Sequence, residues 1–194
     1  PANMNIKEAV RGYGAAAKAL HWLTAVLVVL QVTLALRAWK LPPGSVKNAL
    51  LGQHMSVGLC VLLLTLVRLG RRRQHGAPAL PESISPRLRW AARVNHGLLY
   101  ALLLLLPLSG WTMVSAAGIA PSLFGIVPLP ALLATNAESH QVLKLVHLTL
   151  NTLLFFALPG HVPAPVIDRR PLPERGSEQS QLRFDRQTGQ WVII

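Results

Sequence analysis

The chain has 194 residues, of which 52% are hydrophobic and only 13% are charged, about half the charged fraction of a soluble globular domain. The formal net charge is +12, but the basic residues flank apolar runs, which is typical of an oriented membrane protein and argues against nucleic-acid binding. The only cysteine, Cys60, lies inside an apolar run, so the composition excludes a disulfide framework and a cysteine metal site.

Four apolar segments have the length that a membrane-spanning helix needs: residues 19–38, 50–69, 94–116 and 140–161. The first shows no small-residue cleavage site and is interpreted as a spanning helix rather than a signal peptide. The third contains Pro107, which a membrane helix tolerates as a kink. The fourth is the weakest, because Asn151 and Thr152 interrupt it. The segments predict an all-α fold, a polytopic membrane four-helix bundle.

Basic residues gather in the N-terminal segment, in the second connection and in the tail. They are Lys7, Arg11, Lys18, Arg71, Arg72, Arg73, Arg87, Arg89, Arg93, Arg169, Arg170, Arg175, Arg183 and Arg186. The first connection has only Arg37, Lys40 and Lys47, and the third has none before Lys144. Because lysine and arginine accumulate on the cytoplasmic side, both termini are expected to be cytoplasmic.

Two further segments complete the predicted organisation. The third connection, residues 118–138, is long and mildly apolar, and we expect a short helix or turn that lies on the outer surface and caps the bundle. Residues 162–194 are rich in proline and polar side chains, and we expect a soluble tail without regular structure. The predicted division is therefore a four-helix domain over residues 1–161 and a cytoplasmic tail over 162–194.

The histidines lie at two depths in the predicted helices. His147 and His161 are fourteen residues apart on the fourth segment, which puts them on one face and separates them by about 21 Å along the axis. With cytoplasmic termini, His21 shares the inner level with His161, and His54 shares the outer level with His147. A six-coordinate haem iron takes two axial ligands at one depth from facing helices, so this pattern predicts two stacked haems. His140 is expected to be solvated.

Other residues fit a haem protein, each with an ordinary alternative. Gly58, one turn after His54, lets a porphyrin lie against the helix or simply serves helix packing. Arg68 lies at the inner level, where haem propionates need cations. Lys144 serves outer propionates or extends to the membrane interface. His96, level with His21, is a ligand, a propionate partner, a quinone contact or an interfacial anchor.

The order and spacing of several short motifs resemble the bacterial cytochrome b561 family, which is related to the cytochrome b subunits of nickel hydrogenases and formate dehydrogenases. The motifs are YGAAAKALHWL (13–23), GQHMSVG (52–58), LVRLGRR (66–72), NHGLLY (95–100), LPLSGW (106–111), Phe124 with Gly125, and His147 with His161. The resemblance covers about residues 12 to 161. It implies a four-helix bundle with two b-type haems, the inner held by the first and fourth helices and the outer by the second and fourth.

The resemblance also implies a function in the bacterial inner membrane. We expect the protein to transfer single electrons across the membrane and to exchange them with the quinone pool of a respiratory chain. Quinone is expected to bind near Arg68, His96 and residues 71–73. The donor is a dehydrogenase subunit or a small reductant such as superoxide. A homodimer is left open, as is the question of whether the protein is an enzyme. The alternative is a non-redox membrane anchor or scaffold, which explains the hydropathy but not the paired histidine depths.

The end of the fourth segment departs from the family pattern. Pro159 removes a helical hydrogen bond just before His161, and Pro163 and Pro165 follow it. We expect a kinked last turn that still presents His161 inward as the inner ligand. If the helix instead ends near Leu158, His96 is the other histidine that can complete the site with His21.

Overall fold

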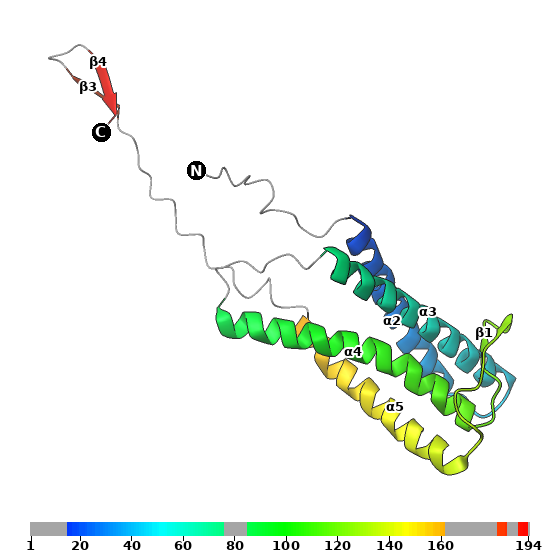
Figure 1. The fold of residues 1–194 in the computed structure, drawn as a ribbon. Helices are drawn as coiled ribbons and strands as arrows, with labels where there is room; N and C mark the ends of the chain where they lie inside the picture. The colour runs from blue at the N-terminus through cyan, green and yellow to red at the C-terminus, as the bar shows by residue number, and fades with distance from the viewer. Residues whose placement is uncertain (1–14, 76–84, 162–181, 186–189, 194) are drawn as a thin grey trace. The chain divides into compact units, whose positions relative to one another are not determined.

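The computed structural model describes residues 15–75, 85–161, 182–185 and 190–193. Four long helices follow one another in this part of the chain: α2 (Ala15–Trp39), α3 (Ser45–His75), α4 (Pro86–Ala116) and α5 (Ala137–Ala157). They lie side by side in Figure 1. Each is long and apolar enough to cross a membrane, when the 3-10 turn η1 (Pro159–His161) is counted with α5. The predicted four-helix membrane bundle is confirmed.

Two helices are longer than their apolar segments. Helix α3 continues through the arginines of residues 71–73, and α4 begins at Pro86, ahead of its apolar part. The start of α4 is capped because the Ser85 hydroxyl accepts a hydrogen bond from the Leu88 amide at 3.4 Å. Pro86 follows in the first helical position, where its missing N–H costs nothing. Hydropathy marks only the apolar part of a helix, so these polar ends were not predicted.

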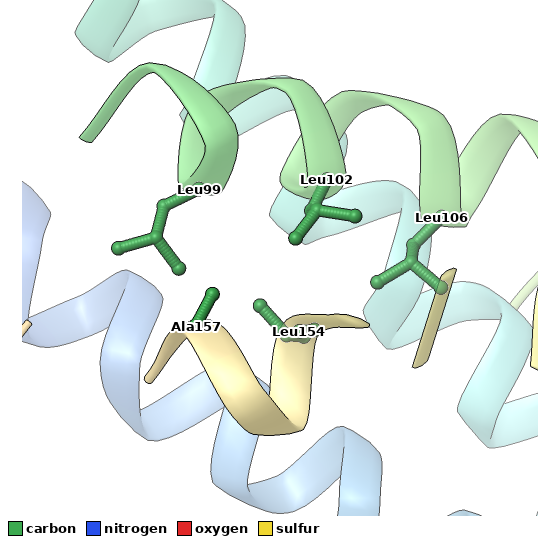
Figure 2. Close-up of a cluster of buried hydrophobic side chains, with 5 residues drawn as sticks. All are labelled: Leu99, Leu102, Leu106, Leu154 and Ala157. Atoms are coloured by element: carbon green, nitrogen blue, oxygen red, sulfur yellow. The ribbon is translucent and has the colours of Figure 1, made fainter. Parts of the chain in front are cut away.

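A hydrophobic cluster joins α4 and α5. It consists of Leu99, Leu102 and Leu106 from α4 with Leu154 and Ala157 from α5. Figure 2 shows these side chains pointing toward one another across the two helices. By contrast, large apolar side chains such as Val29 and Leu63 are 67% and 63% exposed. Apolar residues on the outside of the bundle suit a lipid environment, where they contact hydrocarbon rather than water.

The helices pack unevenly around the bundle. The extensive backbone contacts are those of α2 with α3, of α4 with α5 and of α3 with α4. Among the described residues, α5 approaches neither α2 nor α3 to a comparable extent. Small polar side chains such as Thr24, Ser56 and Thr65 are fully buried, which lets neighbouring helices approach closely where they do pack. Three pairs of the described helices are sparsely packed, and two of them, α2 with α5 and α3 with α5, carry the predicted histidine pairs.

The connection between α4 and α5 forms a tight hairpin. Strand β1 (Ser122–Leu123) pairs antiparallel with β2 (Val127–Pro128), and the turn between them has Phe124 at φ 52° and Gly125 at φ 71°. The hydroxyl of Ser56 on α3 accepts a hydrogen bond from the Phe124 amide at 2.8 Å. Of the two expected forms, the structure therefore has the turn and not the short helix, because a helix has no place for two successive residues with positive φ.

The tail forms a separate unit, residues 162–194, of which the structure describes one hairpin. Strand β3 (Leu182–Asp185) pairs antiparallel with β4 (Gln190–Ile193). The composition of the tail predicts no regular structure, and that prediction is wrong for these two segments. Phe184, Trp191 and Val192 are residue types with high strand propensity, which the overall polarity of the tail conceals. The expected disorder of the remaining tail falls outside the described residues.

Candidate functional site

The level that the basic residues predict to be outer, called the outer level below, contains the two histidines that the sequence places there. The imidazole of His54 on α3 and that of His147 on α5 have ring centroids 6.3 Å apart, at an interplanar angle of 81°. Both side chains are half-buried. The structure thus brings together two residues that are far apart in the sequence and lie on helices with little backbone contact. Their role as ligands stays a prediction.

Each outer imidazole has a hydrogen-bond partner at Nδ1. His54 Nδ1 lies 3.0 Å from the main-chain oxygen of Gln31, and His147 Nδ1 lies 2.9 Å from Ser109 Oγ. A carbonyl oxygen can only accept, so His54 donates its Nδ1 proton and keeps an electron pair on Nε2. The Gln31 amide nitrogen lies 3.4 Å from that Nε2, as a donor to it. The unprotonated nitrogen of His54 is therefore Nε2, which metal-binding histidines commonly use.

Two glycines make room at the outer level. A Cβ on Gly58 would lie 2.7 Å from Gln31 Nε2, and a Cβ on Gly110 would lie 3.3 Å from His147 Cε1. The first distance is shorter than a real Cβ contact, so a side chain at position 58 would require the end of the flexible Gln31 side chain to move. Gly58 was predicted as a site residue from its spacing to His54. Gly110 and Gln31 were not, although Gly110 belongs to the LPLSGW motif.

The inner level contains three histidines, defined here as the inner cluster: His21 on α2, His96 on α4 and His161 in η1. The ring of His161 lies 5.8 Å from that of His21 and 4.9 Å from that of His96, centroid to centroid. His96 donates its Nδ1 proton to the Ala92 carbonyl at 2.7 Å. Within the described residues, Nδ1 of His161 is buried without a hydrogen-bond partner. Both candidate partners of His21 are therefore present.

The proline at the end of α5 changes the last turn without removing His161 from the bundle. The α-helix ends at Ala157, and the His161 amide donates to the Leu158 carbonyl at 3.0 Å in a 3-10 turn. The Ala157 carbonyl accepts instead from the Asn95 side-chain amide of α4 at 3.3 Å. This contact fixes the end of α5 against α4. A tighter last turn that presents His161 inward agrees with the expectation from the sequence.

Two arginines of α3 lie near the inner cluster. Arg68 Nη2 is 3.3 Å from His21 Nδ1, and the guanidinium carbons of Arg68 and Arg72 lie 5.5 Å and 5.7 Å from the centre of the Tyr100 ring. The four described helices contain one acidic residue, Glu138, at the opposite end of the bundle. Half-buried guanidinium groups with no carboxylate nearby among the described residues favour an anionic ligand such as a propionate.

Two other predicted residues have simple environments. Lys144, one turn before His147, is exposed, which fits either the outer propionates or the membrane interface. His140 is half-buried, and its Nδ1 donates to the Met113 carbonyl at 3.1 Å. The expectation that His140 is solvated is therefore wrong. The His140 ring contacts the last turns of α4, and the sequence does not reveal this contact between helices.

The chemistry of the donor set fits haem. Each level offers imidazoles from facing helices, and a bis-imidazole pair is a common axial set for the iron of a tetrapyrrole, whose four nitrogens supply the remaining ligands. The guanidinium groups at the inner level match the acidic edge of such a group. The residues present could therefore hold a haem at either level.

Comparison with known proteins gives one family. The family model described as prokaryotic cytochrome b561 matches residues 12–172. A probable superoxide oxidase of Yersinia pestis is 26% identical over 149 residues, covering 76% of this chain and 83% of the relative. Cytochrome b561 homolog 1 of Escherichia coli is 29% identical over 150 residues, covering 75% and 82%. Cytochrome b562 of Cereibacter sphaeroides is 39% identical over 106 residues, covering 52% and 65%.

Proposed function

The chain belongs to the prokaryotic cytochrome b561 family, and on this premise we propose that it is a di-haem cytochrome that carries electrons across the bacterial inner membrane and exchanges them with quinone. Membership makes it a multi-pass bacterial membrane protein that binds haem b and transfers electrons. The haem iron supplies the one-electron chemistry, and the protein supplies ligands, a dry surrounding and charges. Membership of this family also favours electron transfer over the alternative function, a membrane anchor or scaffold without redox chemistry.

The observation that carries the proposal is the pairing of histidines at two separate levels. We assign His54 and His147 to the outer haem, and His21 and His161 to the inner haem. Between the levels lie Leu102, Leu106 and Leu154 of the hydrophobic cluster, drawn in Figure 2. An apolar layer of this kind excludes water between two redox centres, so electrons pass without protons or ions following through the bundle.

The remaining site residues receive roles from their positions. Gly58 would let the outer haem approach α3, because it has no side chain and, among the described residues, its only near neighbour there is the movable end of the Gln31 side chain. Arg68 and Arg72 neutralise the propionates of the inner haem, and Lys144 is the candidate cation for the outer one. Charge-assisted hydrogen bonds from guanidinium groups to carboxylates are about twice as strong as neutral ones. They therefore fix the rotation of the haem in its pocket.

Quinone and the electron donor are assigned by chemistry and position. The inner cluster with Arg68 lies at the end of the bundle where the arginines of residues 71–73 follow. His96 donates its Nδ1 proton to Ala92, so its Nε2 can accept a hydrogen bond from the hydroxyl of a quinol. One relative is named a probable superoxide oxidase, so a small reductant of that kind is one candidate donor. A dehydrogenase subunit is the other, and a homodimer remains open.

The orientation of the bundle has a direct test. A reporter fused after Ile194 is expected to stay cytoplasmic, and one inserted near Asn136 is expected to be exported, because basic residues gather at the other end of the helices. Alkaline phosphatase is active only after export and serves as the reporter, with green fluorescent protein as the converse control. An exported C-terminal reporter would reverse the inner and outer assignments.

The proposed function is tested by quinol oxidation. The purified chain in liposomes should be reduced by a short-chain ubiquinol, and the reduced-minus-oxidised difference spectrum should show the α-band of a b-type cytochrome. The Arg68→Leu variant should be reduced more slowly, because its charge next to His21 is lost. A chain that carries haem but is reduced only by dithionite would contradict quinone exchange.

A further inference from the structure

Ser109 on α4 makes a contact that no part of the proposed function has used. Its side chain is 8% exposed, and its Oγ lies 2.8 Å from the Leu106 carbonyl and 2.9 Å from Nδ1 of His147. Serine in a helix commonly returns its hydroxyl proton to a carbonyl one turn back. Here the same oxygen also faces an imidazole from another helix.

The direction of the two hydrogen bonds follows from the donors available. The Leu106 carbonyl can only accept, so the single hydroxyl proton of Ser109 goes to it. An Oγ lone pair is then left for His147, whose Nδ1 must carry the proton between them. The chain of hydrogen bonds runs from His147 Nδ1 to Ser109 Oγ to the Leu106 carbonyl, and it leaves the electron pair of His147 on Nε2.

The next residue restricts the same imidazole sterically. A Cβ on Gly110 would lie 3.3 Å from His147 Cε1 and 3.6 Å from Nδ1, so the ring occupies the space that a side chain would need. Ser109 and Gly110 together determine how His147 lies against α4. One provides the hydrogen-bond acceptor, and the other allows the close approach that brings the ring within its reach.

We propose that Ser109 is a positioning residue for the outer haem: it fixes the tautomer and rotation of His147 and lowers the reduction potential of the iron that His147 ligates. This inference rests on the proposed function. A hydrogen-bond acceptor at Nδ1 raises the basicity of a metal-bound imidazole, which stabilises ferric over ferrous iron. The partner ligand His54 donates to a main-chain carbonyl, so no side-chain substitution removes its hydrogen bond. Among the described residues, Ser109 is thus the side chain that hydrogen-bonds Nδ1 of an outer ligand.

The test compares three variants by redox titration and by low-temperature EPR of the purified haem protein. Ser109→Ala should favour the ferrous outer haem about tenfold more than the parent does. For a one-electron couple that is an upward shift of about 59 mV. Ser109→Thr keeps a hydroxyl and should retain the parent potential and EPR signal. Thr112→Ala is the matched control, because the Thr112 hydroxyl also donates within α4, to the main-chain oxygens of Leu108 at 2.9 Å and Ser109 at 3.0 Å, and leaves the Ser109 side chain and its contact with His147 in place.

The outcomes separate this inference from the proposed function. The outer haem is identified as the component that His54→Ala removes. An upward shift in Ser109→Ala, or loss of the outer haem that Ser109→Thr restores, supports the inference. An unchanged potential and EPR signal in Ser109→Ala, or equal changes in Ser109→Ala and Thr112→Ala, would overturn it. A parent chain that binds no haem instead contradicts the proposed function before any variant is compared.

Discussion

Replacement of His54 or His147 by alanine is expected to remove the outer haem and leave the inner haem in place. The two rings lie 6.3 Å apart and come from helices that otherwise make little contact, so each supplies one side of the same site. Loss of one imidazole leaves the iron and the other ligand unpaired in a region of low dielectric constant, which is costly. The measurement is the haem-to-protein ratio, which should fall by about half in each variant.

His140→Ala provides the matched control for this prediction. His140 is also a half-buried histidine on α5, but it donates to the Met113 carbonyl and does not face His54. It should keep the parent haem content. If His54→Ala and His147→Ala both retain the full ratio, the outer pair is not a ligand pair.

The second large effect concerns the inner cluster, where two histidines compete as the partner of His21. His161→Ala is expected to remove the inner haem, because among the described residues His161 is the inner histidine whose ring contacts that of His21, at 5.8 Å. Its Nδ1 is buried without a hydrogen-bond partner in that part of the chain, so no hydrogen bond accounts for the position of this imidazole. The inner component of the redox difference spectrum should disappear.

His96→Ala is the comparison that decides the assignment. His96 already donates to the Ala92 carbonyl, and its ring contacts His161 at 4.9 Å. We expect this variant to keep the inner haem with a shifted potential, because a polar neighbour of the ligand is lost. An inner haem that survives His161→Ala and is lost in His96→Ala would make His96 the ligand.

Much of the architecture could be predicted from the sequence because it depends on hydropathy and helical period. The four spans and the two histidine levels follow from these alone, and the structure brings His54 close to His147 and His21 close to His161. The ends of α3 and α4 were missed because polar residues such as Arg72 continue a helix without a hydropathy signal.

The parts that could not be predicted are contacts between helices. Ser109 and Gly110 contact a histidine of α5. The role of Asn95 cannot be predicted from the sequence, because it depends on the hydrogen bond from its side-chain amide to the end of α5. Gln31 lies ten residues after His21 on α2, and the helical period does not predict that this part of α2 contacts His54 on α3. Such contacts depend on which helices become neighbours, and no local pattern encodes that choice.

The haem stoichiometry of the purified full-length chain tests the central claim most directly. The pyridine haemochrome assay and the protein concentration together give the number of b haems per chain, and a redox titration separates their potentials. Two stacked sites predict about two haems per chain with two resolvable components. One haem per chain would mean that only one of the two proposed histidine pairs binds haem, which contradicts the di-haem assignment. A chain that is folded in the membrane but binds no haem would contradict the proposed function altogether.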